Sequence, residues 1–274
     1  KKVEEWFSTN KMQLNSKKTR YIVFNISRTK RGEPFNLELG GEKLCRVSEQ
    51  SEEKYVCLVG VRIDEDFSYK YHISHIKAKL NRANYMIARC RKVLPRSIRV
   101  LVYNTLVKSV LEFACVLYGA AKRSVVGVLE TVQKKIIRDV IGARSRAHTN
   151  DIFLELGILK FKDLVDYHSK IFAHGIWHKR LPVNIRSDFE IVVKNGRETR
   201  AMGSMNLKIP FCGKKYLEAA PCLTIPIAWN ELDKELKSQI KLHIFKKKLR
   251  TNYLEKYRSE PKCIRGNCFS CART

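Results

Sequence analysis

Residues 72–92, with the sequence HISHIKAKLNRANYMIARCRK, predict a long amphipathic helix that decides the fold. Apolar side chains recur in it at spacings of three and four residues, the period of one helix face. These side chains are Ile73, Ile76, Leu80, Ala83, Ile87 and Cys90. Because the opposite side is polar and basic, we expect the helix to pack its apolar face on the core of a helical domain.

The basic side of this helix carries cations around one aromatic ring: Arg82, Tyr85, Arg89 and Lys92, with Lys77 earlier on the helix. Their spacing places the four on one face, which suits a phosphate backbone with a base or sugar stacked beside it. The alternative is a solvated helix surface, which is what most charged runs are. The surrounding composition favours nucleic-acid contact, since residues 67–111 contain ten Lys or Arg and no Asp or Glu.

The whole chain is strongly cationic. Its 274 residues include 54 Lys and Arg against 27 Asp and Glu, a formal net charge of +27. We expect RNA and RNA–DNA or DNA duplexes as partners, because each phosphate contact releases counterions and adds affinity. A membrane surface is the rival polyanion, but no uncharged apolar run approaches the ~20 residues that span a bilayer, and the first residues do not resemble a secretory signal. The expected location is intracellular, in the nucleus and cytoplasm, without a membrane partner.

The remaining patterns predict an α+β fold that is mainly α. Extended runs at 21–26, 37–47 and 54–63 predict a small antiparallel sheet, with Gly40-Gly41 at a tight hairpin turn. Helices are predicted near 95–113, 124–140, 150–180 and 238–257, with a looser region containing Gly and Pro before the last. The expected buried face of the 95–113 helix is Ile98, Leu101, Val102, Leu106, Val110 and Phe113.

A second basic cluster lies in the last predicted helix and consists of Lys246, Lys247, Lys248 and Arg250. Short basic runs of this kind either follow phosphates or serve as nuclear-import signals. We count the four residues among the expected nucleic-acid contacts and leave the import signal open as the alternative.

Three of the nine cysteines are crowded near the C-terminus, in the spacing C-x4-C-x2-C: Cys263, Cys268 and Cys271. Three thiolates held close together by turns fit a zinc site, although a fourth ligand is missing. The alternative is a reduced tail without metal. The scattered cysteines are expected to be ordinary buried thiols.

Sequence signatures of a complete active site are absent. The chain contains no G-x-S-x-G, no H-E-x-x-H and no G-x-x-x-x-G-K-[ST]. Its first Met is Met12, within what reads as continuing structure. We therefore expect an interior piece of a longer protein.

The stretch from Trp6 to Thr19, WFSTNKMQLNSKKT, with Phe24 after it, resembles a pattern of the reverse transcriptases of non-LTR (LINE-like) retrotransposons of the jockey and chicken-repeat type. That pattern is W-F-x-x-N-K-L-x-L-N-x-x-K-T-x-x-x-x-F. Further matches follow in the same order along the chain. They are LVGVRID at 58–64, His72-Ile73 with Ile76, Leu111-Glu112-Phe113 with Tyr118-Gly119, QKKIIR at 133–138, RETR at 197–200, WNEL at 229–232 and FKKKL at 245–249. Val59, Tyr118 and Asp233 stand where Leu, Trp and Pro are usual.

The resemblance implies a position for the chain within an RNA-directed DNA polymerase. Its first match belongs to palm motif D, so the catalytic aspartates and their Mg²⁺ would lie upstream of Lys1 and this chain alone would be inactive. Lys18 would then be an accessory cation near the phosphates of the incoming nucleotide. The expected nucleic-acid contacts also include Lys134, Lys135 and Arg138 of the QKKIIR match.

The resemblance also implies a division into four parts. Residues 1–66 would be the edge of the palm with a hairpin that grips the primer, 67–147 a helical thumb, 148–262 a C-terminal helical region and 263–274 a basic tail with cysteines. The implied partners are element RNA, target DNA and the upstream palm and fingers of the same polyprotein. Two alternatives remain: a freestanding RNA- or DNA-binding module, decayed or adopted by the host, and helices that mainly make protein contacts in a ribonucleoprotein.

Overall fold

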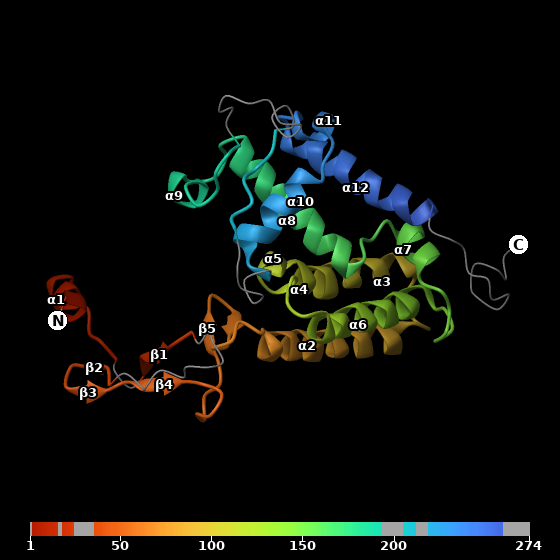
Figure 1. Ribbon diagram of the computed structural model, residues 1–274. Coiled ribbons are helices and arrows are strands. Elements are labelled where there is room, and N and C mark those ends of the chain that lie inside the picture. The colour runs from red at the N-terminus through yellow and green to blue at the C-terminus, as the bar shows by residue number, and fades with distance from the viewer. Residues whose placement is uncertain (1, 16–17, 25–35, 193–204, 212–218, 260–274) are drawn as a thin grey trace, which may run out of the picture. The chain divides into compact units, whose positions relative to one another are not determined.

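The computed structural model describes residues 2–15, 18–24, 36–192, 205–211 and 219–259. Internal contacts divide the chain into two compact units, Lys1–Ser74 and His75–Thr274, and the division falls within one long helix (Figure 1). The boundaries after residues 66, 147 and 262 stay predictions.

The described part of the first unit holds one short helix, α1 (Lys2–Thr9), and three two-stranded sheets. Strands β2 (Glu38–Leu39) and β3 (Glu42–Lys43) form the predicted hairpin, and Gly40 and Gly41 between them both have positive φ, at 60° and 78°. Glycine takes this backbone conformation without the penalty that a Cβ brings. The hairpin prediction is therefore confirmed.

The other two sheets differ in detail from the prediction. The extended run at 54–63 is itself a hairpin, β5 (Val56–Leu58) and β6 (Val61–Ile63), joined by Val59 and Gly60. Strand β1 (Arg20–Ile22) pairs with β4 (Cys45–Val47) in parallel rather than antiparallel fashion. Parallel neighbours need a long connection, and alternation of side chains along single strands does not reveal which strands will pair.

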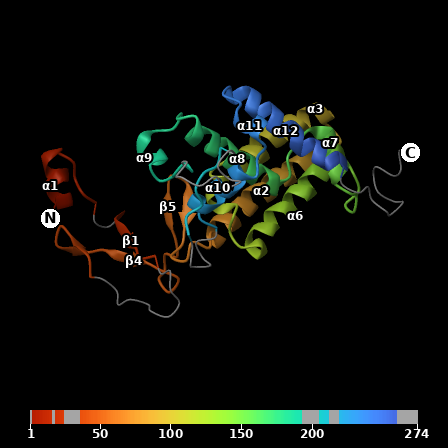
Figure 2. The same ribbon diagram turned by 45° about the horizontal axis from the view of Figure 1, so that its top comes forward.

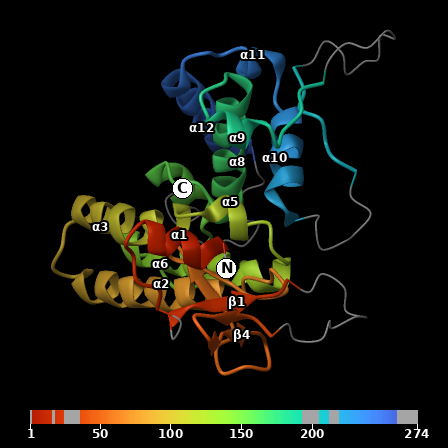
Figure 3. The same cartoon turned by 90° about the vertical axis from the view of Figure 1, so that its left-hand side faces the viewer.

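The second unit is helical, and its long helices are α2 (Lys70–Cys90, which begins in the first unit), α6 (Arg123–Ile141), α8 (Phe161–Trp177) and α12 (Leu242–Ser259). Shorter elements connect them: α3 (Arg96–Val102), the π-helix η2 (Tyr103–Lys108), α4 (Ser109–Glu112), α5 (Cys115–Tyr118), α7 (Asn150–Leu156), α9 (Val183–Arg186), α10 (Pro221–Asn230) and α11 (Lys234–Lys237). Figures 2 and 3 show α10 and α12 lying against α8. The mainly helical α+β fold is confirmed. None of the described helices combines the length and apolar character that a membrane span requires.

The apolar face predicted for α2 is confirmed. Ile73, Ile76, Leu80, Ala83 and Ile87 are all buried, and Cys90 at the helix end is partly buried. The side chains repeat every three or four residues because α2 is a regular α-helix throughout. The opposite face of α2 is therefore left to solvent.

The buried face predicted for 95–113 is wrong at four of its six positions, and Val102 and Val110 are partly buried. Ile98, Leu101, Leu106 and Phe113 are 40–57% exposed, and the buried positions are instead Arg99, Tyr103, Val107 and Leu111. The buried positions repeat every four residues, from Arg99 in α3 through the π-helix η2 to Leu111 in α4. The search for apolar residues at the α-helical period of 3.6 residues identifies the adjacent side of this segment instead.

The loose region expected before the last helix contains a helix within its described part. Helix α10 begins at Pro221 and carries Pro226 in its interior. Trp229 in this helix is fully buried, and its indole N–H donates to the Met205 carbonyl oxygen at 2.9 Å. Tertiary packing around an indole outweighs the helix-breaking tendency of one proline here.

Candidate nucleic-acid interface

The exposed face of α2 brings together the residues that the sequence singles out. Arg82, Tyr85 and Arg89 are all exposed, on the side opposite the buried Leu80 and Ile87. Arg89 Nη1 donates to the Tyr85 hydroxyl at 2.7 Å, and its guanidinium carbon lies 5.5 Å from the ring centroid. This contact holds a cation beside a 60% exposed aromatic ring, the combination that serves phosphate and base together.

No acidic partner for the positive charge of this face is found among the described residues. Helix α2 contains no Asp or Glu, and no ion pair to Lys77, Arg82 or Arg89 is found in the described part of the chain. Lys77 is also exposed. Lys92 lies in the turn after α2 ends at Cys90, so it does not continue the helical face as its spacing suggests.

The second predicted set, on α6, is split by the fold. Lys134 and Lys135 are exposed, but Arg138 turns inward, and its Nε donates to the Ala147 carbonyl oxygen at 2.8 Å. Burial lowers the pKa of the Arg138 guanidinium from its ordinary value. Arg91 donates to the Gly142 carbonyl oxygen and Arg99 to that of Asp139, at 3.2 Å. Arg91 and Arg99 therefore bind carbonyl groups at the C-terminal end of α6, where the helix dipole favours cations.

The basic cluster on α12 does not form one surface, because successive residues of an α-helix point about 100° apart. Lys246 and Lys247 are exposed. Lys248 pairs with Glu235 at 2.7 Å, and Arg250 donates to the Gly157 carbonyl oxygen. Two of the four predicted contacts thus have protein partners.

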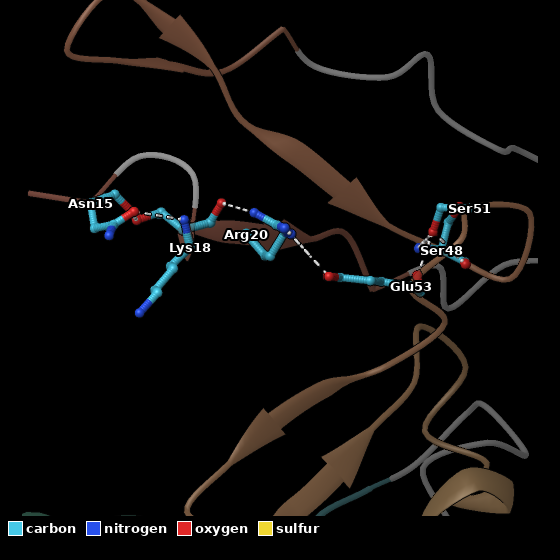
Figure 4. A network of polar contacts seen from close by, with 7 residues as sticks. Asn15, Lys18, Arg20, Ser48, Ser51 and Glu53 are labelled. Atoms are coloured by element: carbon cyan, nitrogen blue, oxygen red, sulfur yellow. Dashed lines mark hydrogen bonds and ion pairs between the residues drawn. The ribbon is translucent and has the colours of Figure 1, made fainter.

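Lys18 lies in the first unit, in a turn before β1 (Figure 4). Its backbone N–H donates to Oδ1 of Asn15 at 3.1 Å, while its side chain extends away and its amine is joined by no dashed line in Figure 4. Beyond it, the guanidinium of Arg20 holds Glu53 through Nε at 2.9 Å. The turn is thereby tied on both sides of Lys18 while its ammonium group stays exposed.

The zinc prediction falls on Cys263, Cys268 and Cys271, which lie outside the described residues. Within the part that the structure describes, no cluster of three or more His, Cys, Asp or Glu could hold a metal ion. The prediction of buried thiols is wrong for Cys45, Cys57 and Cys222, which are exposed. It holds for Cys115, where burial raises the pKa of the thiol to about 12.

Several motif residues act in packing. Gln133 is 1% exposed and its amide is fully used. Its Nε2 donates to the Tyr103 hydroxyl and the Leu159 carbonyl oxygen, both at 3.0 Å, and its Oε1 accepts from the Phe161 N–H at 2.8 Å. Sequence reasoning missed this role, because nothing in the local pattern separates a buried glutamine from the exposed lysines after it.

The residues of two further motifs also act in packing. The Tyr118 hydroxyl donates to the Leu111 carbonyl oxygen at 2.8 Å, and a Cβ on Gly119 would collide with Val165 of α8. In the WNEL motif, Asn230 exchanges two hydrogen bonds with the backbone of Leu207, at 2.8 and 2.9 Å. The residues of these two motifs thus make contacts that hold the fold together.

The two units differ in charge. Residues 1–74 contain 14 Lys and Arg against 11 Asp and Glu, whereas residues 75–274 contain 40 against 16. The second unit therefore carries +24 of the net +27. The polyanion expected from the total charge would be attracted chiefly to the helical unit.

Comparison with curated proteins finds two relatives, each described as an RNA-directed DNA polymerase from the mobile element jockey. The relative from Drosophila funebris is 25% identical over 181 residues, covering 62% of this chain and 19% of the relative. The relative from Drosophila melanogaster is 24% identical over 164 residues, covering 58% of this chain and 17% of the relative. The chain thus spans about a fifth of the length of these relatives.

No protein-family model and no solved structure matches the chain. The two jockey polymerases support the resemblance that the ordered motifs between Trp6 and Leu249 predict. The chain is thus related to a segment of the reverse transcriptases of non-LTR, LINE-like mobile elements.

Proposed function

We propose that the chain is the part of an RNA-directed DNA polymerase that holds the template–primer duplex, with the catalytic aspartates and their Mg²⁺ supplied by an upstream segment. The exposed face of α2 carries the proposal. It offers Arg82, Tyr85 and Arg89 on a helix without acidic residues. Such a face contacts the sugar–phosphate backbone and reads duplex shape rather than sequence.

The partner that fits this face best is an RNA–DNA hybrid or another duplex with A-form geometry. Exposed cations contribute affinity by releasing counterions, so binding should weaken steeply with salt. The cations on the described parts of α6 and α12 are partly used by the fold, and α2 is therefore the principal contact in this proposal. Lys134 and Lys135 remain candidates for secondary contacts.

The test is a charge reversal on α2, Arg82→Glu with Arg89→Glu. Fluorescence anisotropy with a labelled RNA–DNA hybrid should show affinity lower by about tenfold or more at low salt, with a shallower salt dependence. Both positions are exposed, so the unfolding midpoint should change little.

The matched control is Lys234→Glu with Lys241→Glu, which changes the net charge equally at two other exposed positions of the second unit. It should lower affinity much less than the α2 variant. Equal losses in the two variants would mean that total charge, and not this helix face, binds the duplex. Unchanged affinity in the α2 variant would favour helices that serve protein contacts.

A further inference from the structure

The second unit contains a cavity of about 90 Å³ between η2, α4, α8, α12 and the segment after α7. Its apolar wall includes Ile158, Leu159 and Leu164. Its polar wall holds Asn104, Lys108, Glu112 and Arg250, and Tyr167 contributes a half-buried ring. None of these residues belongs to the exposed face of α2, so the cavity needs a separate explanation.

Glu112 is the acidic residue of the cavity. It belongs to the Leu111-Glu112-Phe113 motif, which has no part in the proposed α2 interface. Burial alone would raise the pKa of its carboxyl, but the contacts with His168 and Lys108 outweigh burial and hold the pKa below its usual value. The group is therefore an ionised carboxylate, which only accepts hydrogen bonds. Lys108 at 3.6 Å and His168 at 3.4 Å both approach Oε1.

One cation of the cavity wall, Arg250, is positioned by the backbone. The Arg250 guanidinium donates to the Gly157 carbonyl oxygen. Gly157 has φ +61°, and a Cβ there would lie 3.5 Å from Arg250 Nη2. A glycine thus ends α7 in the left-handed conformation, and the Arg250 guanidinium lies at ordinary contact distance from where a Cβ would be.

The π-helix builds one wall of this cavity. Tyr103, Asn104 and Lys108 all belong to η2, the segment that departs from α-helical geometry. π-Helices are rare and are found frequently at functional sites, because the widened turn redirects side chains at some cost in stability. Asn104 and Lys108 of η2 line the cavity, while Tyr103 stays in the core.

We propose that this cavity receives the Watson–Crick edge of one unpaired guanine. Guanine presents two adjacent donors, N1–H and the N2 amino group, which match the two oxygens of the Glu112 carboxylate. The Asn104 amide supplies a donor for O6. The proposal rests on the proposed nucleic-acid-binding function and adds to it a base-selective site.

Other bases fit this chemistry less well. Adenine and cytosine each offer one amino group beside a ring-nitrogen acceptor, and uracil offers one N–H between two carbonyl groups. Each of them would place an acceptor against a carboxylate that cannot donate. A cavity of 90 Å³ is also smaller than the ~150 Å³ cavity that encloses benzene, so it admits the edge of one ring and no base pair.

The experiment measures binding of GMP, AMP, CMP and UMP to the full chain by isothermal titration calorimetry. GMP should bind about tenfold or more tightly than the others, the discrimination that a bidentate base contact provides. Glu112→Gln should abolish the preference for GMP, because an amide offers one acceptor and one donor group. Asn104→Leu replaces the amide by an apolar group with the same number of heavy atoms at an exposed position, and it should weaken GMP binding while the fold is kept.

The matched control is Glu130→Gln on α6, which removes the same charge away from the cavity and should leave the GMP preference intact. Equal affinities for the four nucleotides, or a preference that survives Glu112→Gln, would overturn the guanine site. If Glu112→Gln does not fold, Asn104→Leu decides. If the chain binds hybrids but does not prefer GMP, only the proposed guanine site is overturned. If it prefers GMP but does not bind hybrids, the proposed duplex-binding function is overturned.

Discussion

Nε2 of His174 lies 2.7 Å from the carbonyl oxygen of Gln239 and ties α8 to the segment between α11 and α12. A carbonyl only accepts, so the proton of the neutral ring resides on Nε2. Nδ1 is buried without a hydrogen-bond partner in the described structure. His178 makes the same kind of bond to the Lys237 carbonyl oxygen at 3.2 Å, and the centroids of the two imidazole rings lie 4.3 Å apart.

This pair should make the second unit sensitive to acid. Burial lowers the pKa of both rings, and the nearby charge of Arg180 adds to the effect. The unfolded chain therefore takes up protons first as the pH falls. Stability should be full above the ordinary His pKa of about 6.5 and decline as the pH drops below it. Urea unfolding followed from about pH 7.5 to about pH 5.5 measures the decline.

A control separates this pair from other histidines. His243→Gln alters an exposed ring and should leave the pH dependence unchanged. His174→Phe should reduce it, because a phenyl ring keeps the stack with Phe245 at 4.4 Å but takes up no proton. If His174→Phe keeps the full acid sensitivity, His174 is not its source.

The buried amide of Gln133 makes a second prediction. Gln133→Leu keeps the side-chain volume but leaves the Phe161 N–H and the Tyr103 hydroxyl without their partner. Unmade hydrogen bonds of buried groups cost about 1–3 kcal/mol each, so the free energy of unfolding should fall by roughly 2–4 kcal/mol. Chemical denaturation checks this, with Gln239→Leu as the partly exposed control, which should change stability by less than about 1 kcal/mol.

The sequence predicts the elements with regular periodicity. The apolar face of α2 follows directly from spacings of three and four, and the Gly40-Gly41 turn follows from the backbone freedom of glycine. The exposed part of the candidate interface, Arg82 to Arg89, is the complement of that face and is equally accessible to reasoning from pattern.

The incorrect predictions have one origin: a local sequence pattern does not show which residues a side chain will contact in the folded protein. The buried face of the 95–113 segment lies one position away from the apolar pattern, and Arg138 turns inward to a carbonyl group nine residues away. The basic run on α12 looks continuous in sequence, yet Lys248 and Arg250 find protein partners. The cavity around Glu112 joins segments that are far apart in sequence.

A third prediction concerns the β5–β6 hairpin. Val59 has φ +48° and is 84% exposed, so a β-branched residue occupies the left-handed region without burying its side chain. Val59→Asn should stabilise the hairpin by about 1 kcal/mol, because Asn-Gly is the preferred pair where both turn residues have positive φ. Hydrogen exchange of the hairpin amides should slow accordingly. Faster exchange in the variant would show that the valine side chain has a stabilising contact.

The last prediction tests the role of Lys18 in a complete polymerase that includes this chain. The ammonium group is exposed while the turn around it is fixed through Asn15 and Arg20. If it stabilises charge on the leaving pyrophosphate, Lys18→Ala should slow single-nucleotide addition by about tenfold or more. Template–primer affinity should change much less, because one phosphate contact in many is a small share of binding.

The matched control is Lys43→Ala, which removes an exposed cation from the β2–β3 hairpin of the same unit. It should leave both the rate and the affinity near their original values. Equal losses of rate and affinity in Lys18→Ala would assign the residue to general electrostatic attraction. A selective loss of rate would instead mean that its charge acts when the bond to pyrophosphate breaks, since only interactions stronger in the transition state accelerate the chemical step.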